Sequence, residues 1–248
     1  MHATSERFQQ HDMKVEIWSD VVCPWCYIGK RRFESALAGF SHREEVEVVW
    51  RSFELDPGAP ALRTGDAAER LAAKYGMSRE QALASHDRLT QMAAQEGLDF
   101  RFDLSQSGNT FDAHRLLHLA AERGLQDQVK ERLFRAYFSE GEPIGDVDTL
   151  VRLVAEVGIA PTEAEAVLAS DTYAAEVRAE EREATALGIT GVPFFVVDRH
   201  YGVSGAQPAD VLAQVLDRAW ADAHPTLVLT PAGVGASETT CTDETCAI

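Results

Sequence analysis

Cysteine is scarce in this chain of 248 residues, which contains four cysteines grouped as two close pairs. Four cysteines are too few to stabilise a chain of this length through disulfide bonds, which excludes a disulfide-rich scaffold. Basic residues are also few, because 23 Lys and Arg face 40 Asp and Glu and leave a net charge of −17. Since phosphate binding needs clustered Lys and Arg, this balance argues against nucleic-acid partners and against anionic membrane surfaces.

Long apolar runs are missing as well. The first residues, MHATSERFQQHDMK, contain no apolar stretch of the kind that a secretory signal needs, and no later run reaches the length of a membrane span. We therefore expect a cytoplasmic protein with no membrane partner. In that compartment, disulfides are usually transient and serve catalysis or sensing.

The order of strand and helix patterns indicates an α/β fold that is interrupted by a long helical stretch. Alternation at Val15 and Ile17 predicts a first strand, and V46-E-V-V-W50 predicts a second that runs on towards Leu55, with a helix between them. From about residue 66 to residue 187, Ala, Glu, Arg, Leu and Gln dominate, and apolar side chains recur at helical spacing.

Strand patterns return at P193-F-F-V-V197 and Y201-G-V-S204, and a helical pattern begins at Pro208. We therefore predict that the chain contains a core, an inserted helical domain and a tail rich in Thr, Pro, Gly and Ser. Their bounds are 13–56 and 188–222 for the core, 57–187 for the insertion and 223–248 for the tail.

The segment D20-V-V-C-P-W-C carries the clearest chemistry, because Cys23 and Cys26 fall where the first strand passes into the first helix. Pro24 suits the first turn of that helix, and Trp25 adds an apolar surface beside the sulfurs. Helical residues at i and i+3 are neighbours, so a small adjustment brings the two sulfurs into disulfide range. The helix N-terminus stabilises a thiolate at Cys23, whereas Cys26 should be less exposed. This asymmetry suits disulfide exchange, in which Cys23 attacks and Cys26 resolves the mixed disulfide.

Two other interpretations of this pair stay open. Zinc sites use the same spacing, and Cys241 and Cys246 would complete a set of four sulfurs. We disfavour a metal-binding module, because Cys23 and Cys26 open a hydrophobic helix and the other two cysteines lie near the far end of the chain. The remaining interpretation is a pair of inert core thiols.

A second segment, T190-G-V-P-F-F195, favours redox chemistry. A proline at the start of a strand can be held in the cis form, which is seldom accidental. Pro193 has no N–H, and the backbone of Val192 stays free to pair with an extended substrate, so the segment predicts a peptide groove beside the reactive sulfur. Taken alone, the segment is better explained by an ordinary trans proline on an edge strand, but the upstream CPWC motif favours the cis form.

Together, D20-V-V-C-P-W-C-Y-I-G-K30, the helical insertion and G191-V-P-F-F195 followed by S204-G-A-Q207 resemble the DsbA-like branch of the thioredoxin superfamily. Within that branch the sequence is most similar to the FrnE group, and N109-T-F-D-A-H-R-L-L117 adds to the likeness. The resemblance implies a thioredoxin fold with a large all-helical insertion, with Pro193 as the cis proline that faces the two cysteines.

The same resemblance implies a disulfide oxidoreductase or isomerase that acts on protein or peptide disulfides. Cys23 would be its nucleophile and Cys26 its resolving thiol, with a cellular thiol as reductant and no organic cofactor. Related sequences that lack one or both cysteines resemble glutathione-dependent 2-hydroxychromene-2-carboxylate isomerases and kappa-class transferases. That alternative would make glutathione a co-substrate, but the presence of both cysteines favours dithiol chemistry.

Four further side chains are candidate site residues. His114 and His118 have the i, i+4 spacing of a helical zinc site, but no Glu follows His114 and its neighbours are apolar, which disfavours metal. The resemblance instead suggests that Asn109 and His114 face a groove between the insertion and the core. Asp20, three residues before Cys23, is expected to be a solvated loop carboxylate.

The second cysteine pair lies in C241-T-D-E-T-C246. On a helix, residues five apart point about 140° away from each other, so the pair can close only if the tail turns back on itself. Asp and Thr are compatible with such a turn. Our hypothesis is that this auxiliary pair exchanges electrons with Cys23 and Cys26. A metal-binding or sensory pair and a tail without function are the alternatives.

Replacing both tail cysteines, in a Cys241→Ser, Cys246→Ser variant, should slow turnover and change the redox state of the CPWC pair. Thiol titration during turnover measures both effects. Turnover and a redox state equal to those of the unaltered protein would show that the tail is no shuttle.

Overall fold

A four-stranded sheet forms the centre of the computed structural model, which describes residues 12–63 and 65–225. Its strands are β1 (Met13–Ser19), β2 (Val46–Ser52), β3 (Phe194–Val197) and β4 (Tyr201–Ser204). The strand order is β2-β1-β3-β4, with β1 and β2 parallel and the other neighbours antiparallel. This order is that of a thioredoxin core and confirms the predicted fold class.

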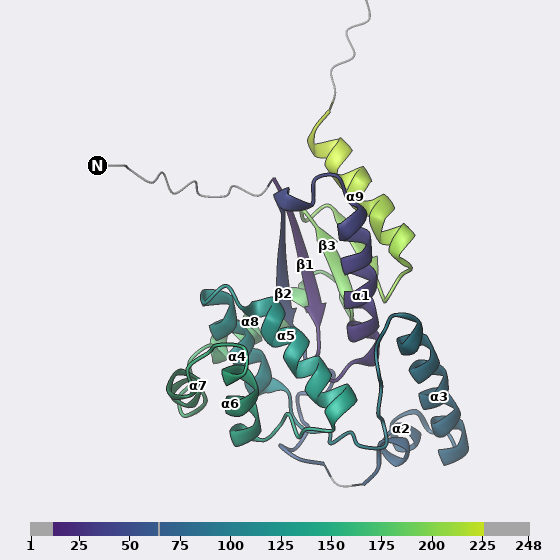
Figure 1. The fold of residues 1–248 in the computed structure, drawn as a ribbon, viewed down its shortest axis with the longest axis vertical. Coiled ribbons are helices and arrows are strands. Elements are labelled where there is room, and N and C mark those ends of the chain that lie inside the picture. The colour runs from purple at the N-terminus through teal and green to yellow at the C-terminus, as the bar shows by residue number, and fades with distance from the viewer. Residues whose placement is uncertain (1–11, 64, 226–248) are drawn as a thin grey trace, which may run out of the picture.

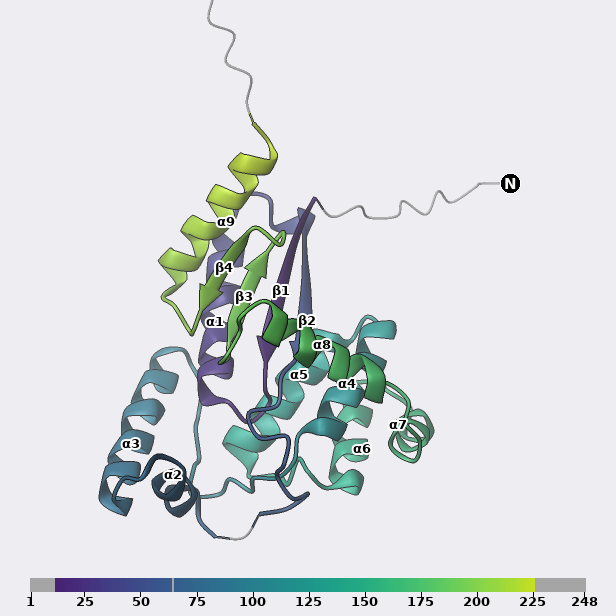
Figure 2. The same ribbon diagram turned by 180° about the vertical axis from the view of Figure 1, so that it is seen from behind.

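Helices surround the sheet on both faces (Figures 1 and 2). α1 (Pro24–Gly39) and α9 (Ala209–Ala223) lie side by side on one face, and the helices between β2 and β3 gather at the lower end of the sheet in Figure 1. The latter are α2 (Ala67–Tyr75), α3 (Arg79–Gln95), α4 (Phe111–Glu122), α5 (Gln126–Arg135), α6 (Val147–Ala155), α7 (Pro161–Leu168) and α8 (Ala174–Ala186). Two single turns complete the described elements, the 3₁₀ turn η1 (Arg43–Glu45) and the π-helical turn η2 (Ala136–Glu140).

Local sequence signals fix several helix ends. The carboxylate of Asp66 caps α2 by accepting a hydrogen bond from the amide of Glu69 (2.7 Å). Gly76 ends the same helix in the left-handed conformation that glycine adopts most readily. Two predicted boundaries differ slightly from the structure. β2 ends at Ser52 and does not run on towards Leu55, and α9 ends at Ala223, one residue beyond the predicted end of the core at 222. The tail cysteines lie outside the described residues.

The alternating side chains of β1 serve two different surfaces. Val15 and Ile17 are fully buried in the apolar layer beneath α1 and α9. Trp18 points to the opposite face, where its indole N–H donates to the carbonyl oxygen of Glu180 in α8 (3.1 Å). The sheet is therefore covered on both faces, with α8 holding the second face.

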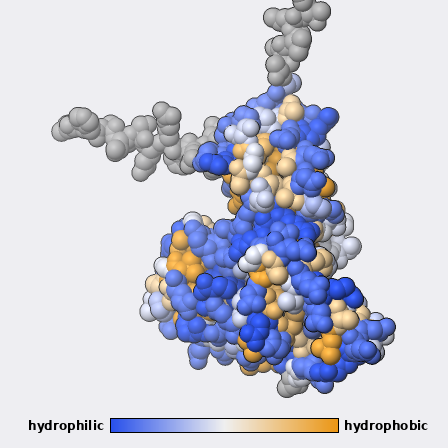
Figure 3. All heavy atoms as spheres, turned by 45° about the vertical axis from the view of Figure 1, so that its right-hand side comes forward, coloured by the Kyte–Doolittle hydropathy of each residue, from blue (hydrophilic) through white to orange (hydrophobic). Residues whose placement is uncertain are grey.

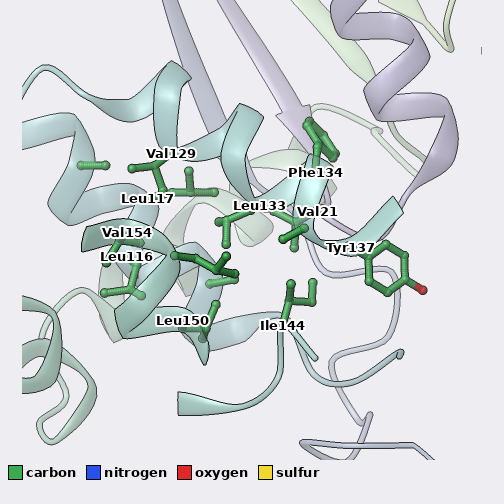
Figure 4. Packing of buried hydrophobic residues seen from close by; sticks show 14 of the residues in the cluster. Val21, Leu116, Leu117, Val129, Leu133, Phe134, Tyr137, Ile144, Leu150 and Val154 are labelled. Carbon is green, nitrogen blue, oxygen red and sulfur yellow. The ribbon is translucent and has the colours of Figure 1, made fainter. Parts of the chain in front are cut away.

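The largest apolar cluster joins the helical insertion to the start of α1. Figure 4 shows Val21, from the loop after β1, beside Leu133 and Phe134 of α5. Cys23 and Cys26 belong to this same cluster. The insertion and the core thus share one packed interior at the end of the sheet where the cysteines lie.

The face of the molecule that Figure 3 presents is mainly hydrophilic, with separate apolar patches. Within 12–63 and 65–225, no helix combines the length and the hydropathy needed to cross a bilayer.

A buried carboxylate helps to fasten α8 to the segment after β2. Glu54 forms an ion pair with Arg178, which also contacts Glu181 (2.7 Å), and the amide of Glu54 donates to Glu181 (3.3 Å). Burial raises the pKa of the Glu54 carboxyl to about 7, reinforced by the nearby charge of Glu181 and opposed by Arg178.

Glu54→Gln should flatten the pH dependence of stability. The folded state keeps the Glu54 proton up to about pH 7, whereas the unfolded chain releases it near 4.5, so stability from this group is lost as pH rises between these values. In the unaltered protein, we expect the free energy of unfolding to fall by about 1–3 kcal/mol between pH 4.5 and pH 7 because of this group. Urea unfolding at several pH values should show no such fall in the variant. Glu163→Gln, which breaks an exposed ion pair with Arg123, is the control and should keep the loss. An unchanged slope in Glu54→Gln would contradict the assignment.

Gly29 permits the close approach of α1 to the segment before β3. A Cβ atom at Gly29 would lie 3.0 Å from Cγ of Pro193, whereas one at Gly39 in the same helix would meet no atom within 4 Å. We expect Gly29→Ala to lower the free energy of unfolding by about 1 kcal/mol or more, because overpacking outweighs the gain in helix propensity. Gly39→Ala should be neutral or slightly stabilising. Equal effects in thermal melts would contradict this packing argument.

Candidate active site

The two cysteines of the CPWC motif form the first turn of α1. Cys23 is the N-cap residue and Pro24 the first helical residue, and the amide of Cys26 donates to the carbonyl oxygen of Cys23 (3.0 Å). Both thiols are free, with 4% of Cys23 and 1% of Cys26 exposed. Trp25, at 40%, is the exposed residue of the motif. The indole of Trp25 is therefore the part of the motif that is most open to solvent.

The segment before β3 lies directly against Cys23, although 169 residues separate the two in sequence. The Cys23 thiol donates to the carbonyl oxygen of Val192 (Sγ···O 3.5 Å), and the Val192–Pro193 peptide bond is cis. The carbonyl oxygen of Pro193 in turn accepts from the amide of Gly205 (2.8 Å). The fold thus brings together the two sequence segments on which the redox prediction depends.

A fully buried lysine, Lys130, is close enough to the two cysteines to influence them electrostatically. Lys130 of α5 donates to the carbonyl oxygen of Ser19 (3.3 Å), and its Nζ lies 5.5 Å and 5.1 Å from the ring centres of Trp50 and Phe134. Burial lowers the pKa of Lys130 to about 8, although the charges of Cys26 and Asp20 act in the opposite direction. Near neutral pH this amine can therefore both accept and release a proton.

The position of Lys130 follows from the way α5 is attached to the edge strand β2. The side-chain amide of Gln126 pairs with the backbone of Trp50, accepting from its N–H (3.0 Å) and donating to its carbonyl (2.9 Å). Asp127 accepts from the indole N–H of the same residue (3.0 Å). Because Gln126 begins α5, these bonds fix the helix that carries Lys130 one turn later.

The thiol of Cys26 holds its proton tightly. Burial raises its pKa well above the usual value, the neighbouring Cys23 adds to the rise, and Lys130 offsets part of it. Cys26 is therefore a protonated thiol at neutral pH, and it must lose its proton before it can attack a disulfide. Lys130 is a buried group whose pKa lies close enough to neutrality to accept that proton.

Asp20 is not a solvated loop carboxylate, so that prediction is wrong. Only 1% of it is exposed, because the loop after β1 turns inward. Its Oδ2 accepts from the amide of Leu55 (2.8 Å), its carbonyl oxygen accepts from the amide of Cys23 (3.1 Å), and its Oδ1 lies 3.5 Å from Nε2 of His114. Burial alone would raise the pKa of Asp20, but His114, the Leu55 amide and Lys130 hold it below its usual range.

Two further predicted residues, His114 and Asn109, contact groups other than the sulfur of Cys23. His114 is buried against Asp20 and not in an open groove. The side chain of Asn109 accepts from the amide of Phe111 (2.9 Å) and donates to the carbonyl of Pro57 (3.3 Å), so it organises the loop before α4. Within 12–63 and 65–225, no three His, Cys, Asp or Glu side chains gather as metal ligands.

Lys130 was not singled out from the sequence, although a signal was there. Val129, Leu133, Phe134 and Tyr137 form an apolar stripe at helical spacing, and Lys130 lies within it. A lysine inside an apolar stripe must be buried or reach solvent past its neighbours. Here it is buried, which marks it as a functional candidate.

The family comparison agrees with this geometry. The model of the DSBA-like thioredoxin domain matches residues 14–217, and the chain belongs to that family. A crystal structure of a probable DsbA oxidoreductase from Streptomyces coelicolor shares 52% identity and superposes with a TM-score of 0.82, covering 91% of this chain and 97% of that one. The protein is thus a member of a thiol oxidoreductase family.

Two further comparisons show the breadth of the group. The YwbO protein of Bacillus subtilis is 30% identical over 205 residues, which are 82% of this chain and 94% of YwbO. A 2-hydroxychromene-2-carboxylate isomerase shares the fold at 15% identity, with a TM-score of 0.60 over 84% of this chain and 97% of its own. Since the fold also serves that isomerase, the activity has to be argued from the site.

Lys130→Met should slow the attack of Cys26 on a mixed disulfide, because the buried thiol loses its proton acceptor. We expect at least a tenfold slower step at neutral pH, as general-base catalysis typically contributes more than this. The step can be followed by stopped flow with an aromatic disulfide that contains two thionitrobenzoate groups. The attack of Cys23 releases the first coloured thionitrobenzoate, and the attack of Cys26 on the mixed disulfide releases the second. Lys30→Met removes another buried lysine, which pairs with Glu34 and with Asp127 and Glu131 of α5, and is the matched control because it disturbs α5 without removing Lys130. Equal rates in both variants would contradict the role of Lys130.

Proposed function

We propose that this protein is a thiol–disulfide oxidoreductase acting on protein or peptide disulfides. One observation carries the proposal: the sulfur of Cys23, one turn before Cys26 on α1, lies 3.5 Å from the carbonyl oxygen of Val192, which precedes the cis bond to Pro193. Its membership of the DSBA-like family supports the reaction type. Within that family, the segments from Asn109 to Leu117 and around Pro193 support placement in the FrnE group.

In the reductive direction, the dithiol reduces a disulfide of the substrate. The thiolate of Cys23 attacks one sulfur of the substrate disulfide, the substrate S–S bond breaks, and one substrate thiolate leaves. Cys26 then gives its proton to Lys130 and attacks the sulfur of Cys23. The Cys23–Cys26 disulfide forms, the second substrate thiolate leaves, and the substrate has gained the two electrons that the dithiol lost. Oxidation of a substrate is the same sequence in reverse.

The surroundings of Cys23 suit an extended, partly apolar chain. The backbone of Val192 lies next to the sulfur, and the exposed indole of Trp25 offers an apolar contact beside it. We propose that a cellular thiol such as glutathione restores the dithiol, that no organic cofactor is needed, and that the reaction takes place in the cytoplasm. The cysteines themselves carry the electrons.

A glutathione-dependent isomerase of small molecules is the alternative with the same fold. That chemistry does not need a second thiol positioned to attack the first. Here Cys26 follows one turn after Cys23, and the buried amine of Lys130 interacts electrostatically with it. This arrangement suits the resolution of a mixed disulfide by Cys26. The site therefore favours dithiol exchange.

The decisive assays are insulin reduction and reactivation of scrambled ribonuclease. The unaltered protein should show at least one activity, and Cys23→Ser should abolish both, because the attacking sulfur is gone. Cys26→Ser should lose most insulin reduction, since the mixed disulfide is no longer resolved from within. Far-ultraviolet circular dichroism checks that both variants are folded. Absence of both activities in the unaltered protein would contradict the proposal, and isomerisation of a small aromatic substrate that survives in Cys26→Ser would favour the alternative.

A further inference from the structure

Arg32 of α1 joins two segments that are distant from it in sequence. Its Nε donates to Oε1 of Glu96 (2.6 Å), the C-cap residue of α3, and its Nη1 donates to the carbonyl oxygen of Ala206 (2.7 Å). The side chains of Arg32 and Glu96 are 18% and 23% exposed, so solvent screens this pair less than it screens a surface ion pair. The exchange reaction proposed above assigns no role to this arginine.

The loop that joins β4 to α9, residues 205–208, connects Arg32 to the segment before β3. The amide of Gly205 donates to the carbonyl oxygen of Pro193 (2.8 Å), and the carbonyl oxygen of the next residue accepts from Arg32. Hydrogen bonds therefore lead from Arg32 through two adjacent loop residues to Pro193. Its neighbour Val192 contacts the reactive sulfur.

A guanidinium group suits this position because its N–H donors point in fixed and different directions. One nitrogen bonds a carboxylate while another bonds a carbonyl oxygen, which the single ammonium group of a lysine does less well. Glu96 orients the guanidinium and is itself anchored, because α3 packs against α1 and its Ala93 is fully buried in the apolar cluster that contains Cys23. The loop is thus held by α1 and, through Glu96, by the helical insertion.

We infer that Arg32 is a positioning residue for peptide substrates, because it holds the loop at residues 205–208 and, through the loop, the Val192–Pro193 segment. The inference rests on the proposed function and deepens it, since it concerns the class of disulfide that the protein prefers. In this arrangement the carbonyl oxygen of Val192 lies 3.5 Å from the sulfur of Cys23.

The consequence is a preference for peptide disulfides over small ones. An extended peptide pairs with the backbone of Val192 while one of its sulfurs meets Cys23, so it needs both groups at a fixed separation. A small aromatic disulfide has no backbone to pair and needs only the sulfur of Cys23. Loss of the Arg32 contacts therefore weakens peptide binding and leaves the reaction with the small disulfide as it was.

Arg32→Gln tests the inference in the full chain with Cys241 and Cys246 replaced by serine, so that only the CPWC thiols react. The substrate is two peptide strands joined by one disulfide, with a fluorophore on one strand and a quencher on the other. The reduced protein is mixed in excess with this peptide, and the rate of dequenching is measured at increasing protein concentration. The half-saturating concentration should rise by about three- to tenfold with the maximal rate unchanged, the pattern of a lost binding interaction.

The small aromatic disulfide gives the second readout, since the first release of thionitrobenzoate should keep its rate in Arg32→Gln. Arg31→Gln is the matched control, because Arg31 is the preceding residue of α1 and pairs with Glu34 (2.7 Å) and Glu131 instead of the loop. It should leave both reactions unchanged. A half-saturating concentration that does not rise in Arg32→Gln, or that rises equally in Arg31→Gln, overturns the inference. So does a reaction with the small disulfide that is slowed as much as the peptide reaction, which would indicate a disturbed site.

Glu96→Gln tests the other end of the arrangement. Without the carboxylate the guanidinium is less well oriented, so the half-saturating concentration should rise in this variant too. The double variant with Arg32→Gln should be no worse than Arg32→Gln alone, because both residues act through one contact with the loop. Additive losses would show that they act separately and would overturn the inference.

Far-ultraviolet circular dichroism checks that each variant is folded. If Arg32→Gln does not fold, Arg32→Lys takes its place, because it keeps a charge beside Glu96 but cannot bond both partners as the guanidinium does. The same rise in the half-saturating concentration is expected, and its absence has the same meaning. An unaltered protein that fails to reduce the peptide at any concentration would instead contradict the proposed function.

Discussion

The ammonium group of Lys130 lies among aromatic rings, and the free-energy cost of burying a charge there constrains everything around it. The carbonyl oxygen of Ser19 and the carboxylates of Asp20 and Glu180 repay part of that cost. The compensation is incomplete, so the pKa of the amine falls to about 8. Cys26, whose thiol is stabilised by the same burial, then has a base in its own apolar surroundings.

This constraint explains why the insertion and the core pack as one interior. The core supplies Cys23, Cys26 and the segment around Pro193, whereas the insertion supplies Lys130. α5 must therefore keep its position relative to α1 and β2. Gln126 fixes it to the backbone of β2, and further along the helix Glu131 accepts from the hydroxyl of Tyr27 in α1 (2.7 Å). Insertion of helices into a thioredoxin core here completes the site as well as enlarging the protein.

The sequence was sufficient for the fold class and for the parts of the site that consist of local motifs. Hydrophobic periodicity located the strands and the helical insertion, and the CPWC motif lies at a strand-to-helix junction, as the sequence predicts. Asp20 was misjudged, because its environment depends on the amide of Leu55 and on His114, which only the tertiary fold brings to it. The contacts of His114 with Asp20 and of His118 with Glu180 could not be predicted for the same reason, since these carboxylates are distant in sequence from the histidines. The apolar stripe around Lys130 predicts that this lysine is buried, but nothing in the neighbouring sequence predicts that it interacts with the cysteines.

The most direct test of the account is to trap the covalent intermediate. A reduced Cys26→Ser protein, with the tail cysteines also replaced by serine, is incubated with a peptide that contains one disulfide and is then analysed by intact-mass spectrometry. The account predicts one peptide attached per chain, bound to Cys23, and none in the Cys23→Ser protein with Cys26 intact. A chain that forms no adduct, or an adduct that forms equally well without Cys23, would contradict the assignment of Cys23 as the attacking sulfur.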